Sequence, residues 1–178
     1  VFEGAHHSIV GMPGLLERTV TVSSVSKSYA MTGWRCGWAV GPIELGLHLR
    51  KMSLITLYGL PGFVMEAANV ALREGVEEIE TARAIYKARR DSVVEELAKA
   101  TEMPLLIPEA GMFLMADVRA HDANANNFAW DLYRATGVSV LDAGAFGSTS
   151  KGWVRISYGL DEASLKEACL RIVNFTKS

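Results

Sequence analysis

Two short apolar runs, residues 19–25 and 36–41, enclose a polar segment of the chain, residues 26–35. The first run consists of β-branched and small residues, which is the composition of a buried strand, and the second is apolar enough to be another short strand. We therefore predict a strand, a loop and a second strand, with Pro42 ending the second strand. Because loops on a rigid scaffold carry a large share of binding residues, we expect the polar segment to be functional.

The rest of the chain shows helical and strand patterns in turn. Apolar residues at helical spacing indicate helices, and continuous apolar runs indicate strands. Turn signals separate these segments. Gly137 is placed to end one helix and Asp161 to begin the last one. The predicted helices are residues 43–52, 63–73, 76–100, 126–136 and the segment after Asp161, and the predicted strands are residues 111–118, 138–141 and 153–158.

Composition excludes several classes of function. Hydrophobic residues make up 49% and charged residues 21% of the chain, and the formal net charge is −2, so no overall basic field exists for nucleic acid or an anionic membrane. No apolar run approaches the about 20 residues of a membrane span. Cys36 and Cys169 are too few for a disulfide framework and lack metal-site spacing. We therefore expect a cytoplasmic protein with no membrane or nucleic-acid partner.

The polar segment supplies the groups that one kind of cofactor requires. Lys27 offers an amine on a flexible stem, which in its neutral form makes an imine with an aldehyde. Arg35 offers a planar, bidentate cation and Ser24 a hydroxyl, both suited to a phosphate. Small residues at Ser26, Ala30 and Gly33 allow tight turns. One exposed lysine in a loop is usually a solvated side chain, but the whole set fits a phosphorylated aldehyde.

Residues 24–37 resemble the attachment-site signature of the class I and II aminotransferases, fold type I enzymes that use pyridoxal 5'-phosphate. Ser, one residue, Ser, Lys, five residues, Gly, one residue and Arg fall on the spacing of that family, and Cys36 stands where an aliphatic residue is usual. The resemblance implies that the cofactor forms a Schiff base with Lys27. It also implies that the cofactor-binding residues are Ser24, Ser26, Lys27 and Arg35.

A second match lies in residues 153–159, Trp-Val-Arg-Ile-Ser-Tyr-Gly. In the family, the strand arginine at this point binds the α-carboxylate of the substrate. Arg155 lies between Val154 and Ile156, so on a strand its side chain points to the face opposite theirs. A lone strand arginine is more often a surface residue, but together with the lysine motif Arg155 becomes the preferred carboxylate binder.

The resemblance covers essentially the whole chain and implies its fold class, which is α/β. Residues 1–60 would be the end of the large domain of a pyridoxal-phosphate-dependent transferase, with its lysine hairpin, and residues 61–178 an α+β small domain. Within the family, residues 57–59 and 111–115 resemble bacterial arginine–pyruvate transaminases.

Several groups of the family have no counterpart in residues 1–178. These are the acid for the pyridine nitrogen, the tyrosine for the ring hydroxyl, the aromatic residue that stacks on the ring and a phosphate-binding loop. The chain also begins with Val1 rather than Met. We therefore expect the C-terminal part of an aminotransferase that works as a homodimer, with no useful turnover in isolation.

The implied reaction is transamination, in which an amino group passes from an amino acid to a 2-oxo acid and Lys27 moves the Cα proton. Two alternatives stay open. The motif specifies the cofactor rather than the reaction, so a lyase-type enzyme of fold type I is one. The other is a non-catalytic fragment or sensing domain that keeps the motif by descent.

Two other segments suggest chemistry at first sight. His6 and His7 are adjacent, so on an extended strand they point to opposite faces, and neither Cys nor carboxylates cluster with them. We predict no metal site. Residues 144–152 contain Gly, Ser, Thr and Lys without the spacing of a P-loop, and we predict a mobile loop near the active-site cleft.

Overall fold

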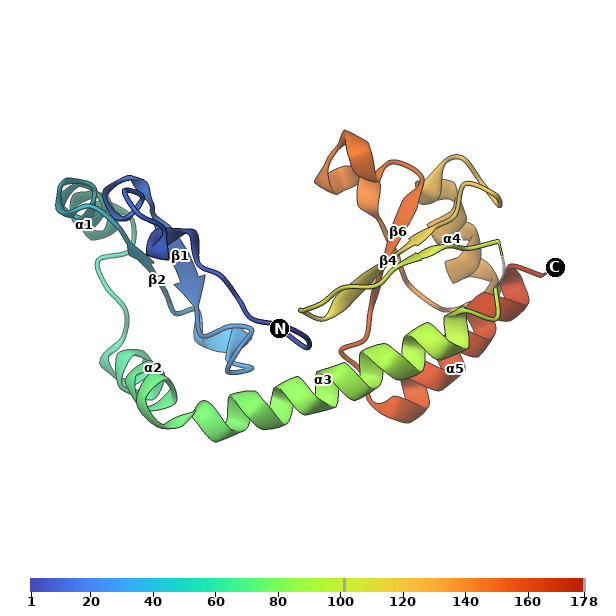
Figure 1. The fold of residues 1–178 in the computed structure, drawn as a ribbon, viewed down its shortest axis with the longest axis horizontal. Helices are drawn as coiled ribbons and strands as arrows, with labels where there is room; N and C mark the ends of the chain where they lie inside the picture. The colour runs from blue at the N-terminus through green and yellow to red at the C-terminus, as the bar shows by residue number, and fades with distance from the viewer. Residues whose placement is uncertain (101, 178) are drawn as a thin grey trace. The chain divides into compact units, whose positions relative to one another are not determined.

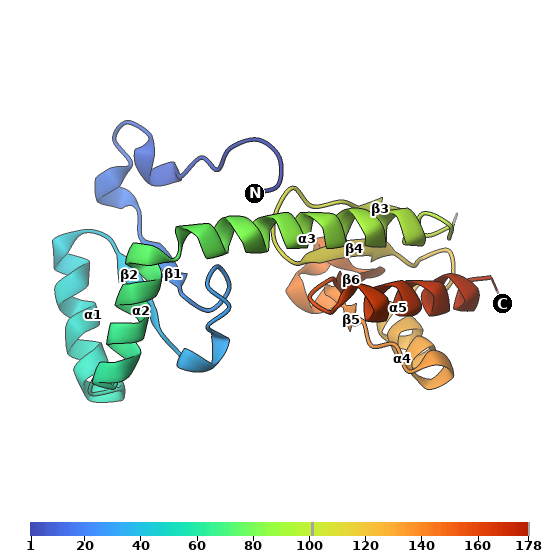
Figure 2. The same ribbon diagram turned by 90° about the horizontal axis from the view of Figure 1, so that it is seen from below.

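A computed structural model describes residues 1–100 and 102–177. The chain divides into two compact units. The N-terminal unit is Gly4–Ala82, and the C-terminal unit is Arg83–Ser178 together with Val1–Glu3. Figures 1 and 2 together label the helices and strands of both units.

The division between the units falls inside one long helix, α3 (Val76–Leu97). The sequence predicted this helix, and its buried residues lie in its second half. The domain boundary that the sequence suggested after residue 60 lies within the N-terminal unit and stays a prediction. None of the helices in residues 1–100 and 102–177 combines the length and apolar character of a membrane span.

The N-terminal unit contains the predicted hairpin and two helices (Figure 1). Strands β1 (Thr21–Ser24) and β2 (Gly37–Val40) pair antiparallel. Pro42 and Pro61 directly precede helices α1 (Ile43–Thr56) and α2 (Gly62–Glu74). A proline is tolerated there because the first helical turn leaves its N–H groups unpaired. The predicted start of each helix is therefore within one residue of the observed start, whereas α1 continues four residues past its predicted end at residue 52.

Few apolar side chains of the N-terminal unit are buried. Val25 is fully buried, and Val64 and Ala68 of α2 are nearly so. In contrast, Val22 and Val40 of the hairpin expose 78% and 61% of their surface. A two-stranded ribbon covers neither of its own faces. The hairpin is therefore held by its backbone pairing and by Val25 rather than by a core of its own.

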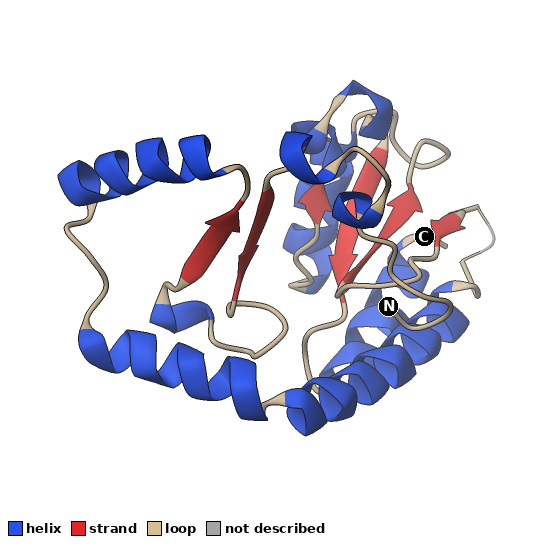
Figure 3. Cartoon of the chain, turned by 60° about the vertical axis from the view of Figure 1, so that its left-hand side comes forward, coloured by secondary structure: helices blue, strands red, loops and turns tan. Residues whose placement is uncertain are grey.

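The C-terminal unit is built around a four-stranded antiparallel sheet in the order β3-β4-β6-β5, drawn red in Figure 3. The central pair of strands matches over five residues, whereas each edge strand has two. Short edge strands limit pairing with other chains. The strands are β3 (Leu105–Leu106), β4 (Phe113–Asp117), β5 (Leu141–Asp142) and β6 (Trp153–Ser157), and the helices that follow β4 and β6 are α4 (Ala125–Thr136) and α5 (Glu162–Phe175).

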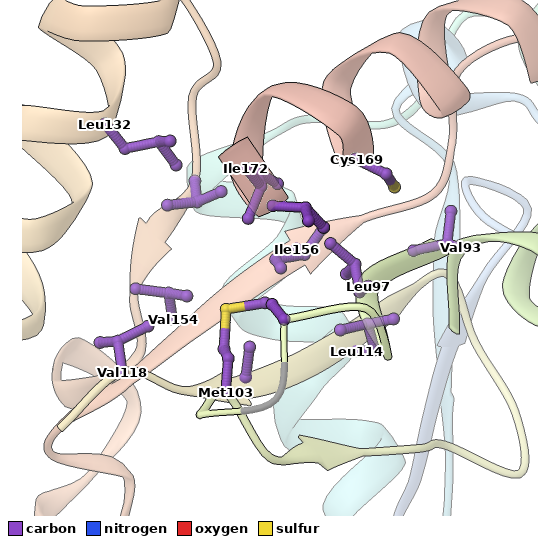
Figure 4. Close-up of a cluster of buried hydrophobic side chains, with 14 of the residues drawn as sticks. Val93, Leu97, Met103, Leu114, Val118, Leu132, Val154, Ile156, Cys169 and Ile172 are labelled. Atoms are coloured by element: carbon purple, nitrogen blue, oxygen red, sulfur yellow. The ribbon is translucent and has the colours of Figure 1, made fainter. Parts of the chain in front are cut away.

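One face of this sheet forms the core. Leu114 of β4 and Val154 and Ile156 of β6 are buried, and side chains from three helices pack with them (Figure 4). Figures 1 and 2 show α3 and α5 side by side against the sheet. The helix residues of the core include Val93 and Leu97 of α3, Phe128 and Leu132 of α4, and Leu165, Cys169, Ile172 and Val173 of α5.

Two helix ends in the C-terminal unit lie at the residues that the sequence predicted. Asp161 caps α5 by accepting a hydrogen bond from the backbone N–H of Ser164 at 3.0 Å. Gly137 ends α4 with a left-handed φ of 76°. Both predictions are confirmed, because capping depends on the residues at the helix end.

Two edge strands were predicted less well. The predicted strand over residues 138–141 is wrong except for Leu141, because Val138 and Val140 pack against the core and pairing with β6 begins at Leu141. Strand β3, Leu105–Leu106, was not predicted. Such short edge strands are defined by their partner strands rather than by their own composition.

Arg90 of α3 ties the first residues of the chain to the C-terminal unit. Its side chain is 6% exposed. Its Nη1 and Nη2 donate to the carboxylate of Glu3 at 2.9 and 2.7 Å, and Nη1 also donates to the carbonyl of Pro108 at 2.8 Å. The ring of Phe2 lies 4.8 Å from the guanidinium carbon. These bonds lower the pKa of Glu3, and hydrogen bonds from Lys87 and Arg90 lower the pKa of Asp91.

We predict that this cluster makes the stability of the C-terminal unit depend on pH below about 4.5. A carboxyl whose pKa is lower in the folded protein stabilises the fold above its unfolded pKa. That stability is lost as the pH falls through the folded pKa. The free energy of unfolding, measured in urea, should therefore fall less between pH 7 and pH 3 for Glu3→Gln than for the natural sequence. Glu95→Gln, on an exposed part of α3, is the control, and an unchanged pH dependence in Glu3→Gln would contradict the prediction.

Candidate functional site

Lys27 lies in the turn that connects β1 to β2. The backbone N–H of Val25 donates to Cys36 at 3.2 Å and that of Met31 donates to Val25 at 3.4 Å, while Ala30 donates to the carbonyl of Lys27 at 3.2 Å. Val25 is fully buried, whereas the side chain of Lys27 is exposed. Hydrogen bonds on both sides of the buried Val25 thus hold the backbone of the turn, and the side chain of Lys27 is exposed to solvent.

The turn is also supported by α2. Gly75 follows α2, and a Cβ at this position would lie 3.1 Å from ring atoms of Tyr29 and 2.6 Å from the carbonyl oxygen of Ala71. The ring of Tyr29 therefore packs where only glycine leaves room. A hollow of about 320 Å³ between the turn and the helices is lined by Tyr29, Met31 and Glu74 among others.

The other predicted cofactor residues lie at the same end of the hairpin. Ser24 is half-buried, and its Oγ accepts a hydrogen bond from the backbone N–H of Ser26 at 3.3 Å. Arg35 is exposed and directly precedes Cys36, which pairs across the hairpin with Val25. Its Nη1 donates to the carbonyl of Thr32 at 2.9 Å. One end of the hairpin therefore carries all four predicted cofactor-binding residues, Ser24, Ser26, Lys27 and Arg35.

This set of donors fits a phosphorylated aldehyde. Residues 24–37 contain an amine, a guanidinium and several hydroxyls, and no acidic residue that would repel a phosphate. Ala30 and Arg35 have left-handed φ values of 53° and 54°, which bend the loop at two points. Such a conformation is uncommon for residues other than glycine, and it is often associated with functional sites.

Gly37 allows the two strands to approach closely at the base of this loop. It faces Ser24 in the strand register. A Cβ at Gly37 would lie 2.8 Å from the carbonyl oxygen of Ser23 and 3.1 Å from the Cβ of Ser24. Any side chain at this position would displace β1 where the lysine loop begins.

Arg155 lies in the middle of β6 in the C-terminal unit, on the face opposite the core. Its backbone is opposite Met115 of β4 on one side and Leu141 of β5 on the other. The guanidinium carbon lies 4.1 Å from the ring centroid of Phe113 and 4.6 Å from that of Phe146. Within the described residues, Arg155 has no hydrogen-bonded or ion-paired partner for its side chain.

The contacts of the Arg155 side chain leave its N–H donors available to bind an anion. A ring face attracts a cation through the ring quadrupole and does not need its N–H donors. The donors of the guanidinium therefore remain for a carboxylate, which a planar fork binds bidentately. Lys27 and Arg155 belong to different units, so the structure describes the two parts of the predicted site separately.

Phe113 and Phe146 were missed by the sequence analysis. Phe113 faces Ser157 in the register of β4 and β6, which makes it a diagonal neighbour of Arg155. Sequence alone does not supply this register. Phe146 falls in the segment predicted to be a mobile loop, and this segment contains 3₁₀ turns over Ala143–Phe146 and Ser148–Ser150. A lone aromatic residue between Gly144 and Gly147 was the one available signal.

Comparison with known proteins connects this geometry to a family. The sequence matches the model of the family "Aminotransferase class I and II" over residues 2–172. The chain belongs to this family. Members of the class I and II aminotransferases use pyridoxal phosphate, and the resemblance on which the sequence analysis relied is confirmed at this level.

Relatives within the family differ in their substrates. Arginine–pyruvate transaminase AruH of Pseudomonas aeruginosa is 45% identical over 172 residues, which cover 97% of this chain and 44% of that protein. LL-diaminopimelate aminotransferase of Maridesulfovibrio salexigens is 39% identical over 165 residues, covering 93% of this chain and 42% of the relative. The chain thus spans less than half the length of these relatives.

Solved aminotransferase structures confirm the fold class. The aromatic aminotransferase from Pyrococcus horikoshii OT3 has a TM-score of 0.94 and 29% sequence identity, and the match covers 98% of this chain and 47% of that one. N-succinyldiaminopimelate aminotransferase from Mycobacterium tuberculosis has a TM-score of 0.89 and 29% identity, with 98% and 46% covered. The mixed helix and sheet architecture is that of this family.

We predict that Gly37→Val weakens retention of pyridoxal phosphate in the natural protein that carries this sequence. The new side chain would push β1 away where the lysine loop begins, and overpacking at such a contact costs about 1–3 kcal/mol. Gly46→Val is the control, because it lies in α1 outside the lysine loop and no atom lies within 4 Å of a Cβ there. Cofactor absorbance after gel filtration measures retention. Equal retention in both variants would contradict the role given to Gly37.

Proposed function

We propose that this chain supplies the lysine and the substrate-carboxylate site of a transaminase that moves an amino group from an amino acid to a 2-oxo acid. The observation that carries the proposal is the lysine turn, where Lys27 is exposed at the end of a hairpin whose other donors suit a phosphate. Family membership supports the same reaction class. The name of the relative AruH supports arginine and pyruvate as the first substrate pair to test.

We assign the binding of the cofactor to the hairpin. Ser24, Ser26 and Arg35 would hold its phosphate, and the amine of Lys27 would hold its aldehyde group. Pyridoxal phosphate supplies an aldehyde that bonds amines and a ring that withdraws electrons from the substrate Cα. Residues 24–37 carry the cations and hydroxyls for this binding without a carboxylate that would oppose it.

The catalytic work of the chain is orientation and proton transfer. Arg155 binds the α-carboxylate through its planar fork and so fixes the direction of the Cα–H bond. The Nζ of Lys27, when it is not bonded to the cofactor, would act as the base that removes the Cα proton and holds it. We further propose that the enzyme is cytoplasmic and that it is a homodimer, an assembly that is typical of the family.

Lys27→Ala should abolish covalent attachment of the cofactor. The side chain is exposed in a turn, so its removal should leave the fold intact. The measurement is mass spectrometry after borohydride reduction, which places a stable pyridoxyl label on the lysine that holds the cofactor. Lys51→Ala on the exposed surface of α1 is the control and should keep the label. A label found on another lysine in Lys27→Ala would refute the assignment.

Arg155→Lys should impair substrate binding more than cofactor binding. An ammonium cannot reproduce a bidentate fork, so kcat/KM should fall about ten- to a thousandfold, with a raised KM for the amino acid. Affinity for pyridoxal phosphate should barely change. Arg134→Lys, on the surface of α4, is the matched control. Equal losses in cofactor and substrate affinity would instead place Arg155 in the cofactor pocket or in the fold.

Product analysis tests the reaction class itself. Transamination gives a 2-oxo acid and an aminated acceptor in equal amounts, and the arginine and pyruvate pair would give alanine. A lyase-type enzyme with the same lysine would instead release ammonia or cleavage products. A protein that binds no cofactor at all would indicate a non-catalytic role.

A further inference from the structure

We propose that Phe146, together with Phe113, is a positioning residue that holds the guanidinium of Arg155 in the orientation that binds the substrate carboxylate. This inference rests on the proposed function of Arg155 and goes beyond it by assigning a role to the 3₁₀ turn Ala143–Phe146. Both rings and the arginine belong to the C-terminal unit.

The turn begins beside Arg155 and is fixed at both ends. Leu141 of β5 pairs directly with Arg155, and the turn follows within two residues. The Oδ1 of Asp142 accepts a hydrogen bond from the backbone N–H of Gly144 at 2.8 Å, and Ala143 is fully buried. The backbone N–H of Gly147 then donates to the carbonyl of Gly144 at 3.3 Å. A turn held in this way places the ring of Phe146 at a defined point.

Asp142 is a carboxylate on the neighbouring strand, but the register turns it away from Arg155. It is opposite Val154, so its side chain lies on the face of Val154, whereas Arg155 lies on the other face. Its Oδ1 instead accepts the hydrogen bond from Gly144 that caps the turn. Asp142 therefore stabilises the turn, and the N–H donors of the Arg155 guanidinium remain available.

Packing in a core does not explain the position of Phe146. The ring exposes 60% of its surface, and it is absent from the hydrophobic core of the unit. What it contacts is the guanidinium of Arg155, with 4.6 Å between the guanidinium carbon and the ring centroid. Phe113 makes the corresponding contact at 4.1 Å from β4. Rings from two separate elements thus converge on one cation.

Two ring contacts restrict the rotation of a side chain that otherwise has many rotamers. A carboxylate binds in the plane of the guanidinium, so fixing that plane lowers the ordering cost of binding. The rings also exclude water from one side of the ion pair, which strengthens its attraction. An ammonium would not stack in the same way, which gives a further reason for arginine at position 155.

The first experiment replaces Phe146 in the natural protein loaded with pyridoxal phosphate. Phe146→Ala should raise KM for both the amino acid and the 2-oxo acid about 3- to 30-fold with little change in kcat, because both substrates carry the same carboxylate. Phe146→Trp keeps a ring face and should retain a KM near the natural value. Phe146→Leu keeps apolar bulk without a ring and should resemble Phe146→Ala. A natural KM in Phe146→Leu or Phe146→Ala would overturn the proposal.

A binding measurement without turnover gives a second readout. Propionate and 5-guanidinopentanoate carry the carboxylate but no α-amino group, so they bind without reacting. Their Kd should rise in Phe146→Ala by the same factor as KM. Trp130→Ala is the matched control, because Trp130 is also an exposed ring beside an arginine, Arg134, at 5.7 Å. An equal effect of Trp130→Ala would show a general loss of stability and overturn the proposal.

A double-mutant cycle separates this inference from the proposed function. In the Arg155→Lys background, Phe146→Ala should change KM by clearly less than in the natural protein, because the contact is already lost. If Arg155→Lys leaves KM unchanged, the proposed role of Arg155 fails. If Arg155→Lys raises KM and Phe146→Ala does not, Arg155 keeps its role and the positioning role of Phe146 is refuted.

Discussion

The pairing of β4 with β6 is the constraint on which the C-terminal unit depends. It sets Leu114 and Ala116 of β4 beside Val154 and Ile156 of β6 on one face, where α3, α4 and α5 cover them. Because side chains alternate along a strand, the same register puts Arg155 on the other face. One set of backbone hydrogen bonds thus determines both the core and the position of the substrate-binding candidate.

The hairpin of the N-terminal unit follows a different principle. Its strands expose most of their side chains, and its loop depends on a few contacts, which are the buried Val25, the close approach at Gly37 and the packing of Tyr29 beside Gly75. Such a segment gains little stability from burial. It can nevertheless hold Lys27 in a defined turn, because the hydrogen bonds on both sides of Val25 close the loop at its base.

Two arginines of the C-terminal unit show how contacts decide the use of one residue type. Arg90 is buried, and its donors bind the carboxylates of Glu3 and Asp91 and the carbonyl of Pro108. Arg155 is half-buried, and the contacts that the described residues give its guanidinium are ring faces. The first arrangement stabilises the fold. The second leaves the donors of the guanidinium for a ligand, which is the property that the proposed function requires.

The sequence by itself determined the elements and residues whose signals are local. The spacing around Lys27, the caps Asp161 and Gly137 and the period of α3 each depend on residues close together in the chain, and they identified the family and most of the elements. The site residues proposed for the cofactor fall in this class, because they share one continuous segment.

Tertiary structure decided the features that depend on pairing between distant segments. The two-residue strands β3 and β5 exist because β4 and β6 offer them partners. The attachment of Glu3 to Arg90 joins residues 87 positions apart. The convergence of Phe113 and Phe146 on Arg155 needs the strand register and the capped turn after Leu141. Residue types and spacing do not encode a register, because it emerges when the whole sheet selects the pairing that buries one face.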